Sequence, residues 1–206
     1  AQSERNPVNK AILHSLLAYE YVDLMRKNRR VLLSRTLLAV DEVPEDIREW
    51  SISQFVDKIG RCNRASLQDS IRLLDTSAEK YVPFVVLEDG SRFYGHDMYH
   101  LLVSRAVDAY RQLDGFSVDS LVQARIERIY LDMMNAYRHR AGSEDAMLLC
   151  SLDYWSWKLT GGISQQPYPT FRMRQEKANR EYLEVLDKLI KEYGSREVCA
   201  EVYIHK

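Results

Sequence analysis

The sequence predicts a mainly α-helical protein: a helical bundle with a helix-turn-helix and one small β-hairpin, arranged like a winged helix. Three observations indicate this fold. The chain has only 8 glycines and 5 prolines in 206 residues, which favours long uninterrupted helices. Segment 9–38 contains neither residue and places apolar side chains at helical spacing. The Asp89-Gly90 pair separates two runs that contain aromatic or β-branched residues, which is typical of a hairpin.

Segment 9–38 is predicted to form one helix about 45 Å long, at 1.5 Å per residue. Four of its apolar side chains lie seven residues apart: Leu17, Leu24, Val31 and Leu38. This spacing permits a coiled-coil-like seam with a second copy. It is equally consistent with a helix inside a bundle, and both alternatives stay open.

The helix-turn-helix is predicted within segment 51–74. Ser51 and Gln54 match a capping box, so a helix is expected to begin there. Gly60 is expected to end it, and Asn63 to cap the next helix. The apolar face of that second helix would consist of Leu67, Ile71 and Leu74. Two short helices joined at a glycine are typical of proteins that insert the second helix into a DNA groove.

The hairpin is predicted from strands at 81–87 and 92–95, and would form the wing. Glycines then separate three expected helices at 97–113, 117–141 and 143–160, and a loop at 161–169 precedes a fourth at 170–193. The tail 196–206 is consistent with either a strand or a frayed helix. The predicted domains are 1–95, with the long helix, helix-turn-helix and hairpin, and 96–206, a C-terminal helical domain.

Composition limits the function classes. The net charge of −1 means that a nucleic-acid site would need a local basic patch. Three widely spaced cysteines form no CxxC pair, which predicts neither a zinc ribbon nor a disulfide framework and favours a reducing, cytoplasmic compartment. No apolar run approaches the roughly 18–20 residues of a membrane span, and the first residues lack a signal-peptide core.

Candidate nucleic-acid contacts cluster in the predicted recognition helix. Arginine pairs with guanine, asparagine or glutamine with adenine, and serine with bases or phosphates. The candidates are Arg61, Asn63, Arg64, Ser66, Gln68 and Arg72, together with Arg92 on the hairpin and Arg29 and Arg30 in a basic run. Asp69 would oppose phosphate. The alternative interpretation is a solvated helix face.

No catalytic residue, metal ligand or cofactor is assigned. His96 and His100 have the i, i+4 spacing that can chelate a metal, but no HExxH motif is present and the other histidines are distant in sequence. A helix start with Asp97 in its first turn is the favoured interpretation. The chain lacks GxSxG, GxxxxGK[ST] and GxGxxG motifs. A metal-dependent hydrolase is the least favoured hypothesis.

Trp155 and Trp157 are two residues apart and cannot both face one core. One of them could lie at a protein contact, where tryptophan is enriched. A helix with a broad apolar face explains them equally well.

A set of residues in segment 38–63 shares order and spacing with a known family. The set is Leu38-Ala-Val-Asp-Glu42, Ile47, Trp50-Ser-Ile52, Gln54-Phe-Val56, Ile59 and Asn63. It resembles a segment of the flagellar master activator FlhD/FlhC family, and the resemblance covers residues 10–65, about a quarter of the chain. It implies a helical, oligomeric activator that binds promoter DNA with a partner. The cysteine cluster of the FlhC partner is absent.

The sequence therefore favours a DNA-binding transcription regulator that binds duplex DNA and self-associates through long helices or has a heteromeric protein partner. A helical adaptor or assembly protein with no nucleic-acid role is the alternative.

Overall fold

A computed structural model describes the chain except for residues 1–2, 36–42, 84, 88, 117 and 161–169. Within the described residues every regular element is helical, and the only β-type pairing is an isolated bridge between Ser77 and Asp97. The prediction of a mainly α-helical fold is confirmed. The helices form two compact units, one of Ala1–Ser91 with Gly95–Ile129 and the other of Arg92–Tyr94 with Tyr130–Lys206.

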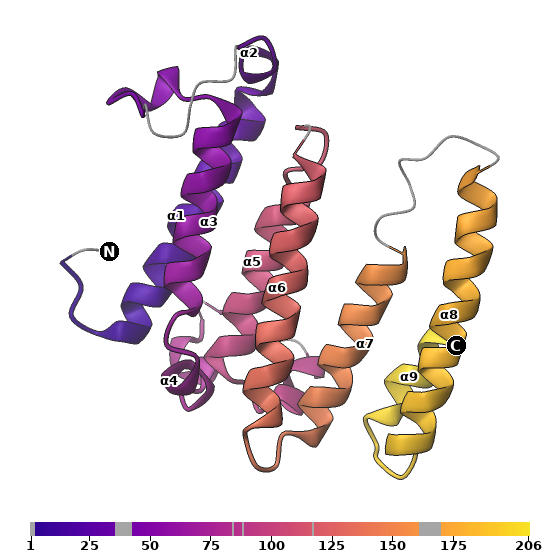
Figure 1. Cartoon of the computed structure of the whole chain (residues 1–206). Coiled ribbons are helices and arrows are strands. Elements are labelled where there is room, and N and C mark those ends of the chain that lie inside the picture. Colours follow the sequence, from indigo (N-terminus) through magenta and orange to yellow (C-terminus); the bar gives the residue numbers. More distant parts are fainter. Residues whose placement is uncertain (1–2, 36–42, 84, 88, 117, 161–169) are drawn as a thin grey trace. The chain divides into compact units, whose positions relative to one another are not determined.

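The first unit is built on α1 (Pro7–Lys27) and α3 (Ile52–Leu67), which run antiparallel (Figure 1). Asn6 caps α1, because its side chain accepts hydrogen bonds from the backbone amides of residues 8 and 9. The predicted capping box of Ser51 and Gln54 starts α3 and is confirmed. Both helices therefore begin where short polar side chains satisfy backbone amides that lack an intrahelical partner.

The buried faces of these two helices have matching 3-4 spacings, which is the pattern of a coiled-coil seam. On α1 the buried side chains are Val8, Ala11, Ser15, Ala18, Val22 and Met25. On α3 they include Ile52, Phe55, Ile59, Cys62 and Ser66. Small side chains are frequent on both faces, so the two backbones can approach closely.

The predicted helix over 9–38 is interrupted. α1 ends at Lys27, Asn28 has a non-helical backbone, and α2 (Arg29–Leu33) takes a different direction (Figure 1). The side-chain amide of Asn28 donates to the carbonyl of Leu24, which caps the end of α1. The expectation of one continuous helix was wrong, and Leu38 lies outside the described residues.

The wing is not seen. Segment 78–81 forms the turn η2 (Ala78–Tyr81), and the predicted second strand is part of η3 (Asp89–Tyr94). Ser77 starts η2 by accepting a hydrogen bond from the Glu79 amide. Capping by Ser77 thus favours a 3-10 turn at η2, and the described residues contain no strand that could form the hairpin.

The rest of the first unit surrounds the α1–α3 pair. α5 (Met98–Arg111) packs against α1, α3 and the short α4 (Ser70–Leu74). The boundary between the two units falls within α6 (Asp119–Arg138). The turn η1 (Ile47–Glu49) leads into α3.

In the second unit, α7 (Glu144–Thr160) packs against α8 (Thr170–Tyr193), and α9 (Cys199–His205) contacts both. Its core includes an aromatic group in which the Tyr130 and Trp157 ring centroids lie 5.7 Å apart. The tail, for which strand and helix were both open, is helical. No described helix combines the length and apolar character that crossing a bilayer requires.

Candidate protein-interaction surface

The predicted turn at Gly60 does not exist. Helix α3 runs through this position, and Gly60 is buried. The Arg125 guanidinium lies directly over it, and a Cβ at position 60 would come within 2.8 Å of the Arg125 Cζ. The guanidinium donates a 2.7 Å hydrogen bond to the Val56 carbonyl and lies against the Tyr110 ring. Glycine at position 60 therefore makes room for a neighbouring side chain, and the helix-turn-helix prediction was wrong.

Two predicted base-reading residues are buried inside α3. Asn63 is 2% exposed and Ser66 is fully buried. The Ser66 hydroxyl donates to the Asn63 carbonyl, as serines within helices often do. The side-chain nitrogen of Asn63 has no hydrogen-bond partner among the residues that the structure describes. Neither side chain can reach a base, because both point toward the core.

The second predicted helix also differs. Asp69 begins α4 by accepting a hydrogen bond from the Arg72 amide, so this aspartate is a helix cap. Ile71, expected in the core, is 75% exposed, whereas Leu73 and Leu74 are buried. Helix α4 has only five residues, which is less than two turns.

The arginines of the predicted site have different local partners. Arg61 pairs with Asp57 at 2.7 Å, and Arg72 with Asp69 at 3.5 Å. Arg64 and Gln68 are exposed. The structure thus neutralises part of the expected positive surface within α3 and α4 themselves.

In the basic run after α1, Arg29 contacts the rest of the first unit and Arg30 is exposed. The Arg29 guanidinium donates a 2.9 Å hydrogen bond to the Gly115 carbonyl and lies 5.2 Å from the centre of the Phe116 ring. Arg30 is exposed and forms no ion pair with the described residues. Arg92 belongs to the second unit, where it pairs with Glu197 at 2.9 Å.

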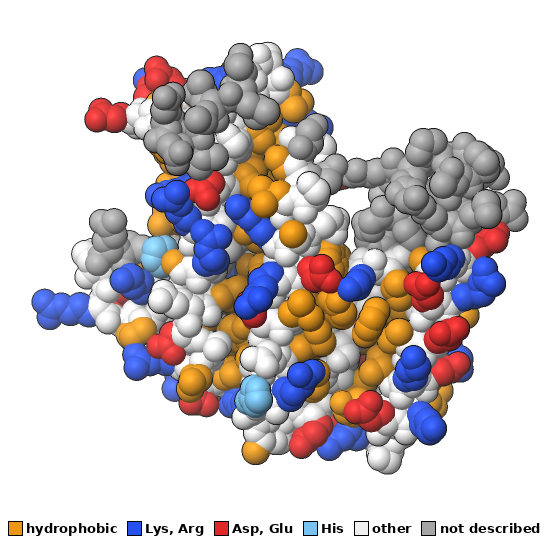
Figure 2. Space-filling model, viewed as in Figure 1, with side chains coloured by type: hydrophobic (Ala, Val, Ile, Leu, Met, Phe, Trp, Pro, Cys, Tyr) orange, Lys and Arg blue, Asp and Glu red, His pale blue; other side chains and the backbone are white. Residues whose placement is uncertain are grey.

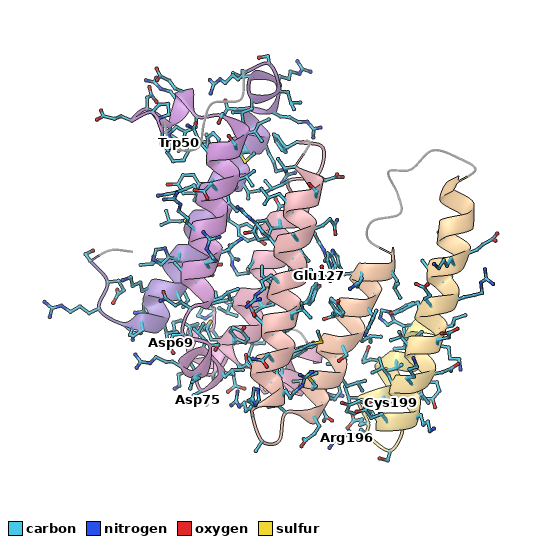
Figure 3. All side chains as sticks on the ribbon, viewed as in Figure 1. Trp50, Asp69, Asp75, Glu127, Arg196 and Cys199 are labelled. Carbon is cyan, nitrogen blue, oxygen red and sulfur yellow. The ribbon has the colours of Figure 1, made fainter. Side chains whose placement is uncertain are left out.

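The remaining cationic candidates of the first unit do not converge. Trp50 and Asp69 mark opposite ends of α3 (Figure 3). Arg30 follows α1 near the Trp50 end, and Arg64 lies in the last turn of α3 near Asp69. A helix of this length separates its ends by roughly 20 Å. On the face seen in Figure 2, basic side chains are interspersed with acidic and hydrophobic ones.

The two histidines considered as metal ligands lie at the start of α5. Buried Asp97 is the cap, and it accepts a 2.7 Å hydrogen bond from the His100 amide. Burial lowers the pKa of His100 to about 4. Among the described residues no group of three or more histidine, cysteine, aspartate or glutamate side chains could hold a metal ion. The favoured interpretation, a capped helix start, is what the geometry supports.

The two tryptophans of α7 lie on different sides of the helix, as expected for residues two positions apart. Trp157 is buried, and Trp155 is partly exposed. The Lys158 ammonium lies 5.7 Å from the Trp155 ring and 5.1 Å from the Tyr154 ring, and it donates to the Tyr154 hydroxyl. The exposed side of Trp155 therefore already has a cation from its own helix.

A polar group in the second unit was not anticipated from the sequence. The Tyr94 hydroxyl lies 3.5 Å from the Asp153 carboxylate. Burial, with further contributions from Cys150 and Asp153, raises the pKa of Tyr94 well above its usual value. The phenol stays protonated and acts as a buried donor. Because these side chains come from distant segments, no local sequence pattern predicts the group.

The side of α1 that faces away from its core contacts carries four leucines among charged side chains. We call this surface the outer leucine face, and it consists of Leu13, Leu16, Leu17 and Leu24. Leu16 is 46% exposed and Leu17 is 39% exposed, while the other two are partly exposed. Val31, the next residue of the sevenfold row, lies on α2 and is also exposed. Leu17 and Leu24 of the sevenfold row thus lie at the surface, and mostly smaller side chains form the buried face of α1.

No protein-family model, no curated protein and no solved structure matches this chain.

Proposed function

We propose that this chain is a helical protein-interaction module whose contact surface includes the outer leucine face of α1. The observation that carries the proposal is the exposure of Leu16 and Leu17 on a helix whose opposite face is already buried against α3. A helix with apolar residues on both faces is normally covered on both. Single exposed leucines are common, but several on one helix face are typical of binding surfaces.

This proposal corresponds to the adaptor alternative. It is supported by the burial of Asn63 and Ser66, and by the ion pairs that occupy Arg61 and Arg72. All three cysteines are free and buried, which supports a reducing, cytoplasmic setting as part of the proposal.

Site-specific photocrosslinking tests the proposal. A benzophenone amino acid is placed at position 17 and, as the matched control, at position 71, which is a more exposed aliphatic site on α4. In extracts of the source cells we expect discrete protein adducts from position 17, which unlabelled wild-type protein reduces and unlabelled Leu17→Glu protein does not. Identical adduct patterns from the two positions, or none from position 17, would contradict the proposal.

DNA binding is a second proposal, carried by the exposure of Arg30 and Arg64, neither of which forms a salt bridge with the described residues. Two phosphate contacts would give a salt dependence with a slope of about −2 in log K against log salt. The test is fluorescence anisotropy on random duplex DNA at moderate salt, with Arg30→Ala plus Arg64→Ala as the variant and circular dichroism as the folding control. Equal binding by the double variant and the wild type would exclude this surface.

A further inference from the structure

Four residues of α1 form a row along its outer side with a 3-4-3 spacing. They are Lys10, Leu13, Leu17 and Glu20. At 3.6 residues per turn these positions fall within an arc of about 80°, roughly opposite the buried face. Lys10, Leu17 and Glu20 are exposed and Leu13 is partly exposed. Neither Lys10 nor Glu20 forms a salt bridge within the described part of the chain.

The row is complementary to itself when it is read backwards. Consider two α1 helices packed antiparallel, with the two-fold axis crossing them at the level of residue 15. Each residue then faces the partner residue for which the two residue numbers add up to 30. Lys10 then faces Glu20 of the partner subunit, and Leu13 faces Leu17 of the partner subunit. Two leucine contacts form the centre, and two opposite-charge contacts close the ends. A two-fold interface requires this kind of self-complementary patch.

The parallel arrangement lacks this complementarity. It would place Lys10 against Lys10 of the partner subunit and Glu20 against Glu20 of the partner subunit. Like charges at such positions oppose pairing, and charges flanking a helix seam set the orientation of the partner. The charge pattern therefore favours the antiparallel pair.

We propose that the outer leucine face binds a second copy of this chain, with the two α1 helices antiparallel and Lys10 of each subunit paired with Glu20 of the other. This inference rests on the proposed function, because it names the partner of the same surface. Leu16 lies beside Leu17 on the same helix and widens the apolar contact. One helix per subunit buries less than the roughly 1,200 Å² of a stable interface, so the dimer belongs to the weak class.

Sedimentation velocity of the purified full chain, from low micromolar to several hundred micromolar, tests the inference. The wild type is expected to move from monomer to dimer across this range. Leu17→Glu is expected to remain monomeric with an unchanged circular dichroism spectrum. Lys10→Glu and Glu20→Lys each convert two attractive contacts into two repulsive ones, and each is expected to weaken association about tenfold.

Two rescue experiments identify the geometry. The double variant Lys10→Glu with Glu20→Lys restores both pairs and is expected to dimerise like the wild type. An equimolar mixture of the two single variants also restores them, and is expected to form the heterodimer in preference to either homodimer. Lys80→Glu and Glu79→Lys are the matched controls, because they change exposed charges on η2 by the same amounts.

Three outcomes would overturn the inference: a wild type that stays monomeric throughout, single charge reversals that dimerise like the wild type, or a mixture that shows no preference for the heterodimer. If position 17 crosslinks other proteins while the purified chain stays monomeric, the self-pairing is wrong and the interaction function stands. If neither result is obtained, both are wrong.

Discussion

The two faces of α1 differ in burial, and the larger apolar side chains are on the exposed face. The inner face, which packs against α3, is built largely from alanine, serine and valine, with Met25 at one end. The outer face carries leucines, and Leu16 and Leu17 are exposed. Burial along this helix therefore follows the position of the neighbouring helix. Small side chains allow close packing against α3, and the larger apolar ones lie on the exposed side.

The same contrast recurs at smaller scale. Arg29 points to the Gly115 carbonyl and the Phe116 ring, whereas its neighbour Arg30 is exposed. His100 on α5 is largely but not fully buried, whereas His139 is exposed. The two residues of each pair have the same side chain but differ in their contacts with the rest of the protein. Mutating both therefore tests how much those contacts contribute to stability.

The largest expected effect comes from truncating one residue on each face of α1. Met25→Ala removes a fully buried side chain and leaves a cavity, so we expect the free energy of unfolding to fall by about 3 kcal/mol. Leu17→Ala is expected to change it by less than about 0.5 kcal/mol. Urea denaturation at low micromolar protein, where the chain is monomeric, measures both. Equal losses would show that the outer face is also core.

The pH dependence of the free energy of unfolding tests the environment of His100. Its pKa is about 4 in the folded protein, because burial disfavours the charged imidazole, and near 6.5 in the unfolded chain. Below about pH 6.5 the unfolded chain binds a proton that the folded chain does not bind until about pH 4. Stability is therefore expected to fall as pH falls between these values, by about 2–3 kcal/mol from this group.

Denaturation midpoints at several pH values measure this loss. His100→Gln is expected to reduce the slope between pH 6.5 and pH 4. A His100→Gln variant with the wild-type slope would contradict the assignment of the pH dependence to this residue.

A substitution at Gly60 tests whether the contact between α3 and Arg125 contributes to stability. Alanine normally stabilises a helix by up to about 1 kcal/mol relative to glycine. Here the added Cβ would displace Arg125 from the Val56 carbonyl, so we expect Gly60→Ala to destabilise the protein by about 1 kcal/mol. In an Arg125→Ala background the same change is expected to be stabilising. A double-mutant cycle by urea denaturation measures the coupling, and additive effects would refute it.

The smallest effect is expected at the start of α2. Arg29→Ala removes a charged hydrogen bond and a cation–π contact at the surface, and should cost about 0.5–1 kcal/mol. Arg30→Ala is expected to have no measurable effect on stability. Thermal denaturation of the two variants side by side compares them. The interpretation fails if Arg30→Ala is the more destabilising.

Much of the secondary structure could be predicted because its signals are local. Ser51 and Gln54 cap α3 as expected, and the predicted helix over 97–113 corresponds to α5. Gly115 and Gly142 have positive φ and follow helices, as glycines at helix ends often do. A cap or a glycine end depends on a few neighbouring residues, so it can be read without knowledge of the fold.

The candidate site could not be predicted in the same way. Gly60 has the same local signal as a helix-ending glycine, yet a side chain about 65 positions away keeps it inside α3. Asn63 looked like a cap and is buried in the middle of the helix. The charges of Lys10 and Glu20 became informative only when their shared outer position was known.

The sequence by itself determined that this protein is helical, where helices α5 to α8 begin and end to within a few residues, and which side chains are apolar. Only the tertiary structure decided which apolar face of α1 is core, which arginines are structural, and that α3 passes through its glycine. The physical reason is that caps and periodicity act over one or two helical turns, whereas burial depends on contacts between segments far apart in the chain.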